Sequence, residues 1–528
     1  MRSFHLPGRS PVLARHGMCA TSHPAASLVA IETLKRGGNA VDAAIAATAL
    51  LCVIEPAMTG IGGDCFALIH KPGTGLLALN ASGRAPAAAT AKWYADAGIK
   101  QIAVTSPHAV TVPGAIDGWA TLLRDHGTMS LADVLAPAIE AAEAGFVVAP
   151  RVAHDWAGLV AKINLNVGAR QHLLFDDRSP AVGDTIRFKA LAATLKAIAR
   201  DGRDAFYKGA IAEDMVSELN ALGGLHALGD FAAQKSSYVT PISVAYAGAE
   251  LHELPPNNQG IVALMMLRMI DRLDVRSAAA GSIERYHLML EAARLAYAAR
   301  DAFVADPDHA KVAPTYMLSD SFIGDLVERS DRSKRTVALK PIPRPAGTDT
   351  ICLSVVDKNG LAVSFINSLF AGFGSGIVTR KTGIVLQNRG SGFVCDPSHP
   401  NCIGPGKRPM HTLVPALATK AGKPWLAFGV MGGALQPAGH VFVLANRIDY
   451  GMDIQEAIDH PRAFFENNDV LVEQPLLGTV ADGLSHMGHT VSLRADPWGG
   501  GQAVEIDHQR GILIGGSDAR KDGCALGY

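Results

Sequence analysis

Hydrophobic and polar side chains alternate along one stretch in the second half of the chain. Ile351, Leu353 and Val355 alternate with Cys352 and Ser354, which is the two-residue period of a β-strand. The next four residues, Asp-Lys-Asn-Gly, are turn formers, and Asn-Gly suits the positive φ angles of a tight turn. A second apolar run follows the turn. The sequence therefore predicts a β-hairpin deep inside the chain.

Alanine-rich apolar runs near the start of the chain predict two closely packed helices. The first covers residues 24–35, with Ser22 as its N-cap and Gly-Gly at its end, and the second covers residues 40–53. Later apolar runs predict strands at residues 384–386, 413–418 and 425–430, and a helix at 437–448. Because strands and flanking helices occur in both halves, we expect two sheets covered by helices.

Composition narrows the class of protein. The chain has 528 residues, 48% of them hydrophobic, and a formal net charge of −1, which allows a large core and argues against nucleic acid as a partner. No apolar window is long enough to span a bilayer, so we expect no membrane contact. Seven scattered cysteines and an N-terminus without an apolar signal segment are typical of a cytoplasmic protein with reduced thiols.

The predicted hairpin begins at Thr350, directly after a loop that ends in Asp349. A threonine at the start of a strand is usually structural. It becomes a nucleophile if the Asp349–Thr350 bond is cut, because the freed α-amine, with a pKa of about 8, can accept the proton of its own hydroxyl. The residues around Thr350 decide between these two interpretations.

Several motifs resemble the γ-glutamyltransferase (glutathione hydrolase) family of N-terminal-nucleophile hydrolases, nearer its cephalosporin acylase-like and amidohydrolase-like branch. They are Thr350 with Ser-Val-Val-Asp-Lys-Asn-Gly at 354–360, Gly-Gly-Asn-Ala-Val-Asp-Ala at 37–43, Glu55-Pro56 and Gly-Ile-Gly-Gly at 60–63. The resemblance implies an α+β, four-layer αββα fold. It also implies self-cleavage into a large subunit, 1–349, and a small subunit, 350–528, which remain together as a heterodimer or as a dimer of heterodimers.

The resemblance assigns roles to individual residues. Thr350 would be the nucleophile, Ser368 would orient its hydroxyl, and the backbone N–H groups of Gly432 and Gly433 would form the oxyanion hole. The implied reaction is acyl transfer from a small-molecule amide, without cofactor or metal. The segment Lys-Arg-Pro at 407–409 precedes two positions at which the family holds a substrate carboxylate.

Those two positions are His411 and Thr412, which we expect to bind substrate. The family's acidic pair for the substrate ammonium is absent, and Arg389 stands in that segment. Arg84 takes the place of the family's carboxylate-binding arginine, two residues further along the chain. If both arginines face the pocket, the sequence favours an anionic acyl group without an ammonium, as in glutaryl or oxamate-like amides, over a true γ-glutamyl group.

Two other functions remain open. The chain could be an uncleaved relative that binds a small molecule without catalysis, or a thiol amidase that uses Cys352. The glycine-rich segment 372–376 lacks the strand–helix context of a dinucleotide site. Cys395, His399 and Cys402 lie in one loop, but their spacing matches no common zinc site, so we expect no metal there.

Overall fold

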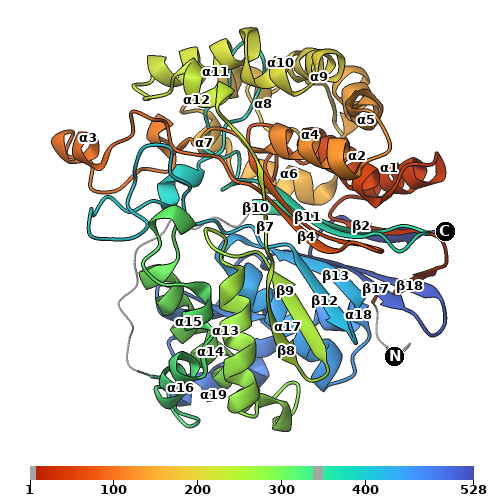
Figure 1. The fold of residues 1–528 in the computed structure, drawn as a ribbon, viewed down its shortest axis with the longest axis vertical. Helices are drawn as coiled ribbons and strands as arrows, with labels where there is room; N and C mark the ends of the chain where they lie inside the picture. The colour runs from red at the N-terminus through yellow and green to blue at the C-terminus, as the bar shows by residue number, and fades with distance from the viewer. Residues whose placement is uncertain (1–7, 337–348) are drawn as a thin grey trace.

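Two antiparallel β-sheets lie face to face in the middle of the molecule (Figure 1). The structure is a computed structural model, and it describes residues 8–336 and 349–528. The first sheet has, in spatial order, β19 (Cys524–Gly527), β2 (Met18–Thr21), β10 (Asp349–Val356), β11 (Ala362–Phe370), β3 (Asp64–Lys71), β4 (Gly75–Ala81) and β7 (Ser237–Val239). The second has β1 (Val12–Ala14), β18 (Ile512–Ser517), β17 (Gly500–Asp507), β13 (Lys423–Met431), β12 (Ala416–Lys420), β9 (Ala249–Glu253) and β8 (Ile242–Tyr246).

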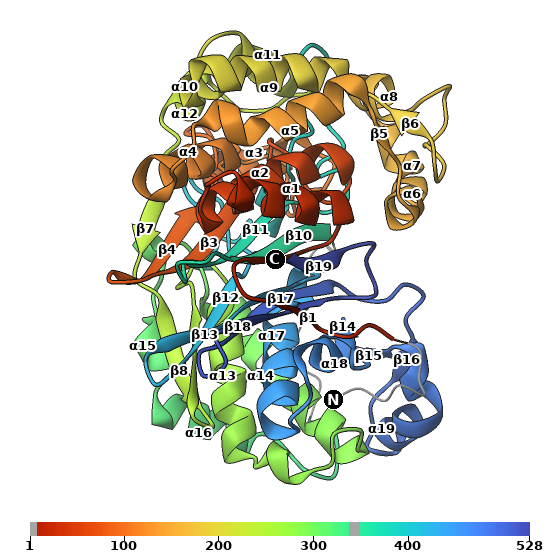
Figure 2. The ribbon, with the colours of Figure 1, turned by 90° about the vertical axis from the view of Figure 1, so that its right-hand side faces the viewer.

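Helices cover the outer face of each sheet (Figures 1 and 2). The first sheet is covered by α1 (Pro24–Lys35), α2 (Ala40–Ile54), α4 (Ala115–His126), α5 (Leu131–Ala144), α9 (Lys189–Asp201) and α11 (Ala210–Ala221). The second is covered by α13 (Gly260–Arg272), α14 (Ile283–Phe303), α17 (Gln436–Asp449) and α18 (Ile454–Asp459). Two antiparallel sheets between helical layers are the α+β arrangement that the sequence predicts.

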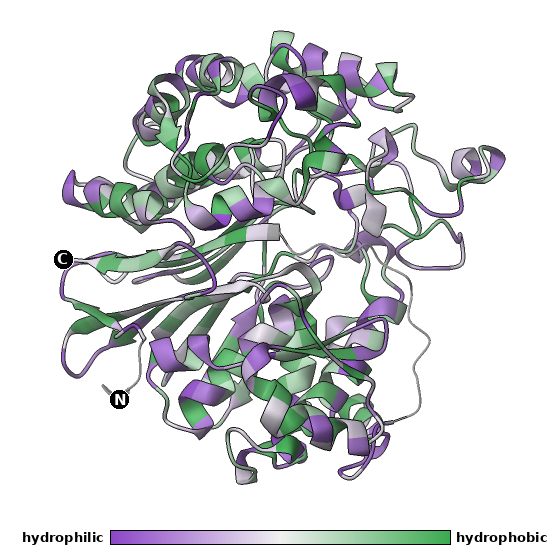
Figure 3. Ribbon diagram, turned by 180° about the vertical axis from the view of Figure 1, so that it is seen from behind, coloured by the Kyte–Doolittle hydropathy of each residue, from purple (hydrophilic) through white to green (hydrophobic). Residues whose placement is uncertain are grey.

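A separate hydrophobic core fills the space between the two sheets. Phe66, Cys352 and Ile366 reach into it from the first sheet, and Leu417 and Val504 reach into it from the second. The alternation that predicts β10 is explained by this position, because one face of the strand meets the opposite sheet and the other meets α2. In Figure 3 the strands and the helix faces against them are mostly hydrophobic, and the polar segments lie outside.

The predicted hairpin is confirmed as β10 and β11, which pair antiparallel from Val356 opposite Ala362 to Asp349 opposite Phe370. Gly360 closes the turn with φ +82°, a conformation that favours glycine. The register shifts between Asp349 and Ile351, so Thr350 lies at an irregularity of the ladder. The Asp349 side chain is outside the described part of the structure.

Each sheet contains strands from both sides of the proposed cleavage point. Strand β10 pairs with β2 on one side and β11 on the other, and β2 also pairs with β19. In the second sheet β1 pairs with β18, and β9 pairs with β12. The chain segments before and after Thr350 are therefore interleaved by backbone hydrogen bonds and share both cores.

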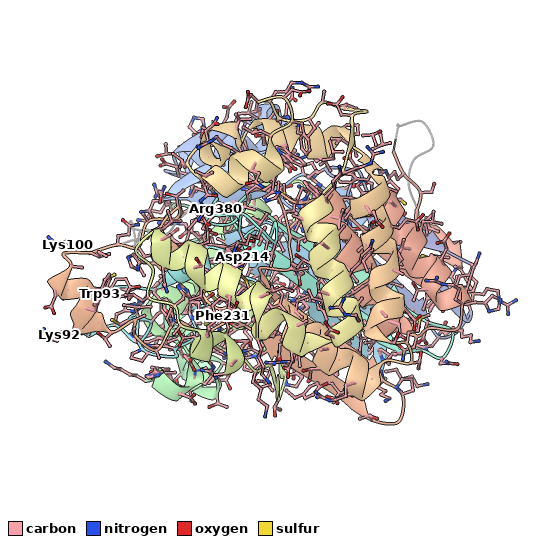
Figure 4. The ribbon with its side chains drawn as sticks, turned by 90° about the horizontal axis from the view of Figure 1, so that it is seen from above. Lys92, Trp93, Lys100, Asp214, Phe231 and Arg380 are labelled. Atoms are coloured by element: carbon pink, nitrogen blue, oxygen red, sulfur yellow. The ribbon has the colours of Figure 1, made fainter. Side chains whose placement is uncertain are left out.

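The outer helical layer adds polar contacts between the same two parts of the chain. Asp214 on α11 accepts hydrogen bonds from the backbone N–H of Thr382 at 2.9 Å and from its hydroxyl at 2.8 Å. Arg380 donates to Glu218 at 2.8 Å. Asp214 and Arg380 are labelled in Figure 4, on the helical side of the molecule.

Two local predictions are wrong. His23, not Ser22, caps α1, because the helix begins at Pro24 and the adjacent His23 Nδ1 accepts from the backbone N–H of Ala25. The Ser22 hydroxyl instead donates to Glu55 at 2.7 Å. Residues 384–386 form no strand, since only isolated bridges link Val385 to Val378 and Leu386 to Gly62. The sequence also predicts an exposed linker over the polar segment 329–349, which falls mostly on residues 337–348, outside the described residues.

No helix in the described part of the chain is long and apolar enough to cross a membrane. All seven cysteines are free thiols, and Cys19, Cys52, Cys65, Cys352 and Cys402 are buried. The interleaved strands therefore hold the fold together without disulfides. The cytoplasmic location stays a prediction.

We expect the fragments 1–349 and 350–528 to remain associated after the bond between them is cut. Separating them would break the pairing of β10 with β2 and of β1 with β18 and would expose both cores to water. Size-exclusion chromatography of cleaved protein in native buffer should give one peak that contains both fragments. Separate peaks without denaturant would contradict this expectation.

Candidate active site

Thr350 lies at the start of a central strand and is almost completely buried, with 1% of its surface exposed. Its hydroxyl donates a hydrogen bond to the Ser368 hydroxyl on β11 at 3.1 Å. The same Ser368 oxygen accepts from the backbone N–H of Phe370 at 2.8 Å. The structure therefore brings Thr350 and Ser368 together, and Ser368 fixes the direction of the threonine hydroxyl.

Packing between the sheets places Cys352, two residues after Thr350, beside the ends of β13 and β17. Ser354 Oγ donates to the carbonyl of Gln502 at 3.1 Å, and Cys352 Sγ lies 3.6 Å from the carbonyl of Gly500 and 3.4 Å from that of Gly429. Gly500 pairs with Met431 at the end of β13, where the Gly432–Gly433 loop begins.

The loop between β13 and α17 turns sharply at two glycines. Gly432 and Gly433 have φ angles of +128° and +57°, which residues with a β-carbon rarely adopt. The Gly432 carbonyl accepts from the N–H of Leu435 at 3.0 Å. Because carbonyl and N–H point in opposite directions across a trans peptide, the Gly433 N–H points away from that turn.

Gln259, the residue before α13, connects this loop to the segment that carries Thr412. Its Nε2 donates to the carbonyl of Gly433 at 3.0 Å and to the carbonyl of Thr412 at 2.9 Å. Arg300 on α14 donates to Gln259 Oε1 at 2.6 Å and so fixes the amide orientation. One buried amide thus sets the distance between the two backbone segments, a role that the sequence does not reveal.

Arg389 is a buried cation with an unused hydrogen-bonding edge. Only 1% of its surface is exposed, its Nη1 donates to Thr412 Oγ1 at 2.6 Å, and its guanidinium lies 4.2 Å from the centre of the Phe370 ring. Nε and Nη2 are buried and have no hydrogen-bond partner among the described residues. Among the described residues, none has a carboxylate within 4.0 Å of this guanidinium. Burial lowers the pKa of Arg389 to about 9.

Nε and Nη2 form the edge with which an arginine binds a carboxylate through two parallel hydrogen bonds. Arg447 uses the same edge on Glu505 in this protein, at 2.8 and 2.7 Å. Arg389 presents this edge without an anion, and it contacts Phe370, whose N–H donates to Ser368. A carboxylate bound there would lie near the Thr350 hydroxyl.

His411 is completely buried and has both ring nitrogens engaged. Nδ1 accepts from the N–H of Leu413 at 3.2 Å, so Nε2 carries the proton and donates to Asp64 at 3.0 Å. Asp64 also accepts from the backbone N–H groups of Gly83 and Gly114, each at 2.9 Å. Burial, with the charge of Arg389, lowers the pKa of His411 to about 3. In this arrangement His411 positions the loops around the site and has no nitrogen left for a ligand.

Arg84 contacts other residues than those around Arg389. Its Nη1 donates to the carbonyl of Gly406 at 2.9 Å and lies 3.8 Å from Asp306, and 37% of its side chain is exposed. Within the described residues these contacts hold the loop before residue 407. A role for Arg84 in substrate binding stays a prediction.

Comparison with known proteins decides the family. The sequence profile of gamma-glutamyltranspeptidase matches residues 26–528. The chain belongs to the gamma-glutamyltranspeptidase family. The resemblance noted from the motifs is confirmed, as is the prediction of a hydrolase.

Three relatives are similar over almost the whole chain. A glutathione hydrolase-like YwrD proenzyme of Bacillus subtilis is 36% identical over 98% of this chain and 99% of its own. An oxamate amidohydrolase proenzyme of Klebsiella pneumoniae is 35% identical with the same shares of each chain. The crystal structure of a cephalosporin acylase from Bacillus halodurans superposes with a TM-score of 0.92 at 37% identity, covering 100% of this chain and 99% of that one.

For this member of the gamma-glutamyltranspeptidase family, the structure disfavours Cys352 as nucleophile. The thiol points into the core between the sheets, towards the carbonyls of Gly429 and Gly500, and is 1% exposed. Burial raises its pKa to about 12, so the thiol is protonated at neutral pH.

One buried group in the described residues has side chains that could hold a metal ion: His287, Glu291 and His489. His287 Nδ1 and His489 Nε2 are 2.9 Å apart, and Glu291 accepts from Arg294 at 2.6 Å and from the backbone N–H of Thr336 at 2.9 Å. These partners attach residue 336, the last before the undescribed segment, to α14. His489 lies 202 residues from His287 in the chain, so no local sequence pattern indicates this group.

The buried, neutral His411 predicts a loss of stability in acid. Its pKa in the folded protein lies below the ordinary value, so the unfolded chain binds a proton that the folded one resists. The stability is present above about pH 6.5 and falls as the pH drops towards the folded pKa, by up to about 2 kcal/mol at pH 5 for this one group. The thermal midpoint should therefore fall between pH 7 and 5 more steeply in wild type than in His411→Gln. Equal slopes would contradict this assignment.

Proposed function

We propose that this protein is a self-cleaving amidohydrolase that uses Thr350 as an N-terminal nucleophile and acts on amides of small anionic acyl groups, such as glutaryl or oxamate-type groups. The observation that carries the acyl specificity is the buried, unpaired Nε–Nη2 edge of Arg389. The proenzyme names of the B. subtilis and K. pneumoniae relatives support self-cleavage, and the oxamate amidohydrolase supports a small anionic substrate.

In the proposed maturation step, the Thr350 hydroxyl attacks the Asp349 carbonyl, and the Asp349–Thr350 C–N bond breaks to give an ester and the free α-amine of Thr350. Water then hydrolyses the ester, which restores the Thr350 hydroxyl and leaves Asp349 as a C-terminal carboxylate. That amine then accepts the hydroxyl proton during catalysis. Ser368 directs the hydroxyl, since it already accepts its hydrogen bond. The product is an N-terminal-nucleophile enzyme of two fragments, 1–349 and 350–528.

In the proposed reaction, Thr350 Oγ attacks the substrate carbonyl and the Gly432 and Gly433 N–H groups stabilise the oxyanion. Arg389 and the Thr412 hydroxyl hold the acyl carboxylate, because they already form one hydrogen-bonded pair. The amine leaves with the proton taken from Thr350, and water hydrolyses the acyl-threonine ester. Arg389 remains charged throughout, since a bound carboxylate raises the pKa that burial lowers.

Selectivity for the acyl group depends on the charge of the side chains that line the pocket. A γ-glutamyl group carries an ammonium in addition to its carboxylate, and Arg389 replaces carboxylates that would pair with that ammonium. Placing an ammonium in the same desolvated site as a guanidinium is unfavourable. An acyl group with a carboxylate and no ammonium avoids this cost.

We expect kcat/KM for glutaryl-4-nitroanilide to exceed that for γ-glutamyl-4-nitroanilide by at least about tenfold, a difference of about 1.4 kcal/mol. Arg389→Met should lower kcat/KM for the glutaryl substrate by about 100-fold or more, because a charge-assisted bidentate pair is lost. Arg380→Met, which removes a half-exposed arginine that contacts Glu218 on α11, serves as a matched control. A preference of wild type for the γ-glutamyl substrate would refute the proposed acyl specificity.

The same assay separates the proposed nucleophile from the thiol alternative. Thr350→Ala should abolish turnover, and Cys352→Ala should retain it, since the thiol faces the core. Loss of turnover only in the cysteine variant would establish the thiol amidase. Absence of turnover by wild type, together with saturable binding of glutarate, would leave the binding-protein alternative.

A further inference from the structure

Phe370, the last residue of β11, has a backbone conformation that a phenylalanine rarely adopts. Its φ angle is +84°, in the left-handed region that favours glycine, and only 6% of its surface is exposed. A bulky residue keeps such a conformation only where the contacts around it hold it there, and this kind of backbone strain is common at active sites. The contacts of Phe370 therefore indicate what the strained conformation serves.

The backbone of Phe370 contacts the residues that hold the nucleophile. Its N–H donates to Ser368 Oγ at 2.8 Å, and the same oxygen accepts the hydrogen bond of the Thr350 hydroxyl at 3.1 Å. Phe370 also pairs across the β10–β11 ladder with Asp349, the residue before the nucleophile. Phe370 therefore lies beside Thr350 and takes part, through Ser368, in directing its hydroxyl.

The side chain of Phe370 contacts the buried arginine of the site. The Arg389 guanidinium lies over the Phe370 ring, 4.2 Å from its centre, and Arg389 Nη1 donates to Thr412 Oγ1 at 2.6 Å. A cation is attracted to the face of an aromatic ring, so the ring and the hydroxyl together hold the guanidinium in place. They leave the Nε–Nη2 edge without a hydrogen-bond partner among the described residues.

Hydrogen bonds on both sides of Phe370 tie its backbone to the segment that carries Arg389. The N–H of Asn388 donates to the carbonyl of Leu369 at 3.2 Å, and Asn388 Oδ1 accepts from the N–H of Ala371 at 3.2 Å. Asn388 is completely buried and directly precedes Arg389 in the chain. The arginine therefore cannot shift relative to Phe370 unless these buried hydrogen bonds break, which is costly.

We propose that Phe370 is a specificity-determining residue that fixes the separation between the Thr350 hydroxyl and the Nε–Nη2 edge of Arg389, so that the enzyme selects dicarboxylic acyl groups of one chain length. The inference rests on the proposed function. In that function the acyl carbonyl lies at Thr350 Oγ while the far carboxylate of the same group lies on Arg389. Because the separation is fixed, an acyl chain that is one methylene too short or too long loses one of these two interactions.

A second phenylalanine in the same turn of the chain provides a matched control. Phe373 also has a positive φ angle, +52°, and is completely buried. Its ring packs against Trp156, with the ring centres 5.3 Å apart, and its N–H donates to the carbonyl of Ala57 at 2.9 Å. Phe370 and Phe373 therefore share a backbone conformation, but the ring of Phe370 contacts Arg389 and the ring of Phe373 belongs to the core under the helical layer.

The 4-nitroanilides of oxalyl, malonyl, succinyl, glutaryl and adipyl groups test the inference on cleaved protein. We expect wild type to favour one length in kcat/KM by at least about tenfold over its neighbours in the series, which differ by one methylene. Phe370→Leu, which removes the aromatic face under the guanidinium, should reduce this preference to about threefold or less. Phe370→Tyr, which keeps the ring, and Phe373→Leu should both retain it. Ratios between variants are compared, because the intrinsic reactivity of each anilide then cancels.

The outcomes distinguish this inference from the proposed function. Turnover of all five anilides by wild type with kcat/KM values within about threefold of one another would overturn the fixed spacing and leave the proposed function standing. A Phe370→Leu variant that loses the same factor on every anilide would also overturn it, because Phe370 would then be merely structural. If Phe370→Leu does not fold, Phe370→Gly, which adopts a positive φ without a β-carbon, takes its place. Absence of turnover of all five by wild type would overturn the proposed function and, with it, this inference.

Discussion

The pairing of β10 between β2 and β11 is the constraint on which the rest of the structure depends. It places Thr350 at the second residue of a central strand, beside a hydroxyl partner on β11. Strand β2, which precedes the bond at Asp349–Thr350, lies between β10 and β19. A chain break at that position changes the chemistry of one residue and leaves the hydrogen-bonded sheet intact.

Asp518 and Arg389 are both buried charged groups, but they differ in the partners that neutralise their charge. This difference separates a structural group from a functional one. Asp518 is buried but paired with Arg462 at 2.6 Å and with the Gly501 N–H at 2.7 Å, and this network holds the start of β17 near the Gly432–Gly433 loop. Among the described residues, the equally buried Arg389 has only a hydroxyl and an aromatic ring as partners. An uncompensated buried charge is costly to a fold. Such a group is best explained by a ligand that supplies the missing anion.

Local sequence patterns predicted the strands and helices whose formation depends mainly on residues close together in the chain. The alternation of Ile351, Leu353 and Val355 located the central strand, and the alanine-rich run from residue 40 located α2. The strand expected at residues 384–386 failed because a short apolar run forms a ladder only where a neighbouring strand runs beside it. Sequence spacing cannot show such a neighbour.

Some residues of the site were predicted from the sequence and others were missed, for the same reason. Motif likeness pointed to Thr350, Ser368 and the two glycines, and the structure brings the two hydroxyls into contact. Gln259 was missed because a buried amide between two carbonyls leaves no local pattern.

The most direct test of this account is the intact mass, under denaturing conditions, of purified active protein. Self-cleavage at Asp349–Thr350 predicts two species with the masses of residues 1–349 and 350–528, the second with Thr350 as its N-terminal residue, and a single uncut chain in Thr350→Ala. Active protein that consists only of the uncut 528-residue chain, or that is cut at another bond, would contradict the central claim that Thr350 acts through a free α-amine.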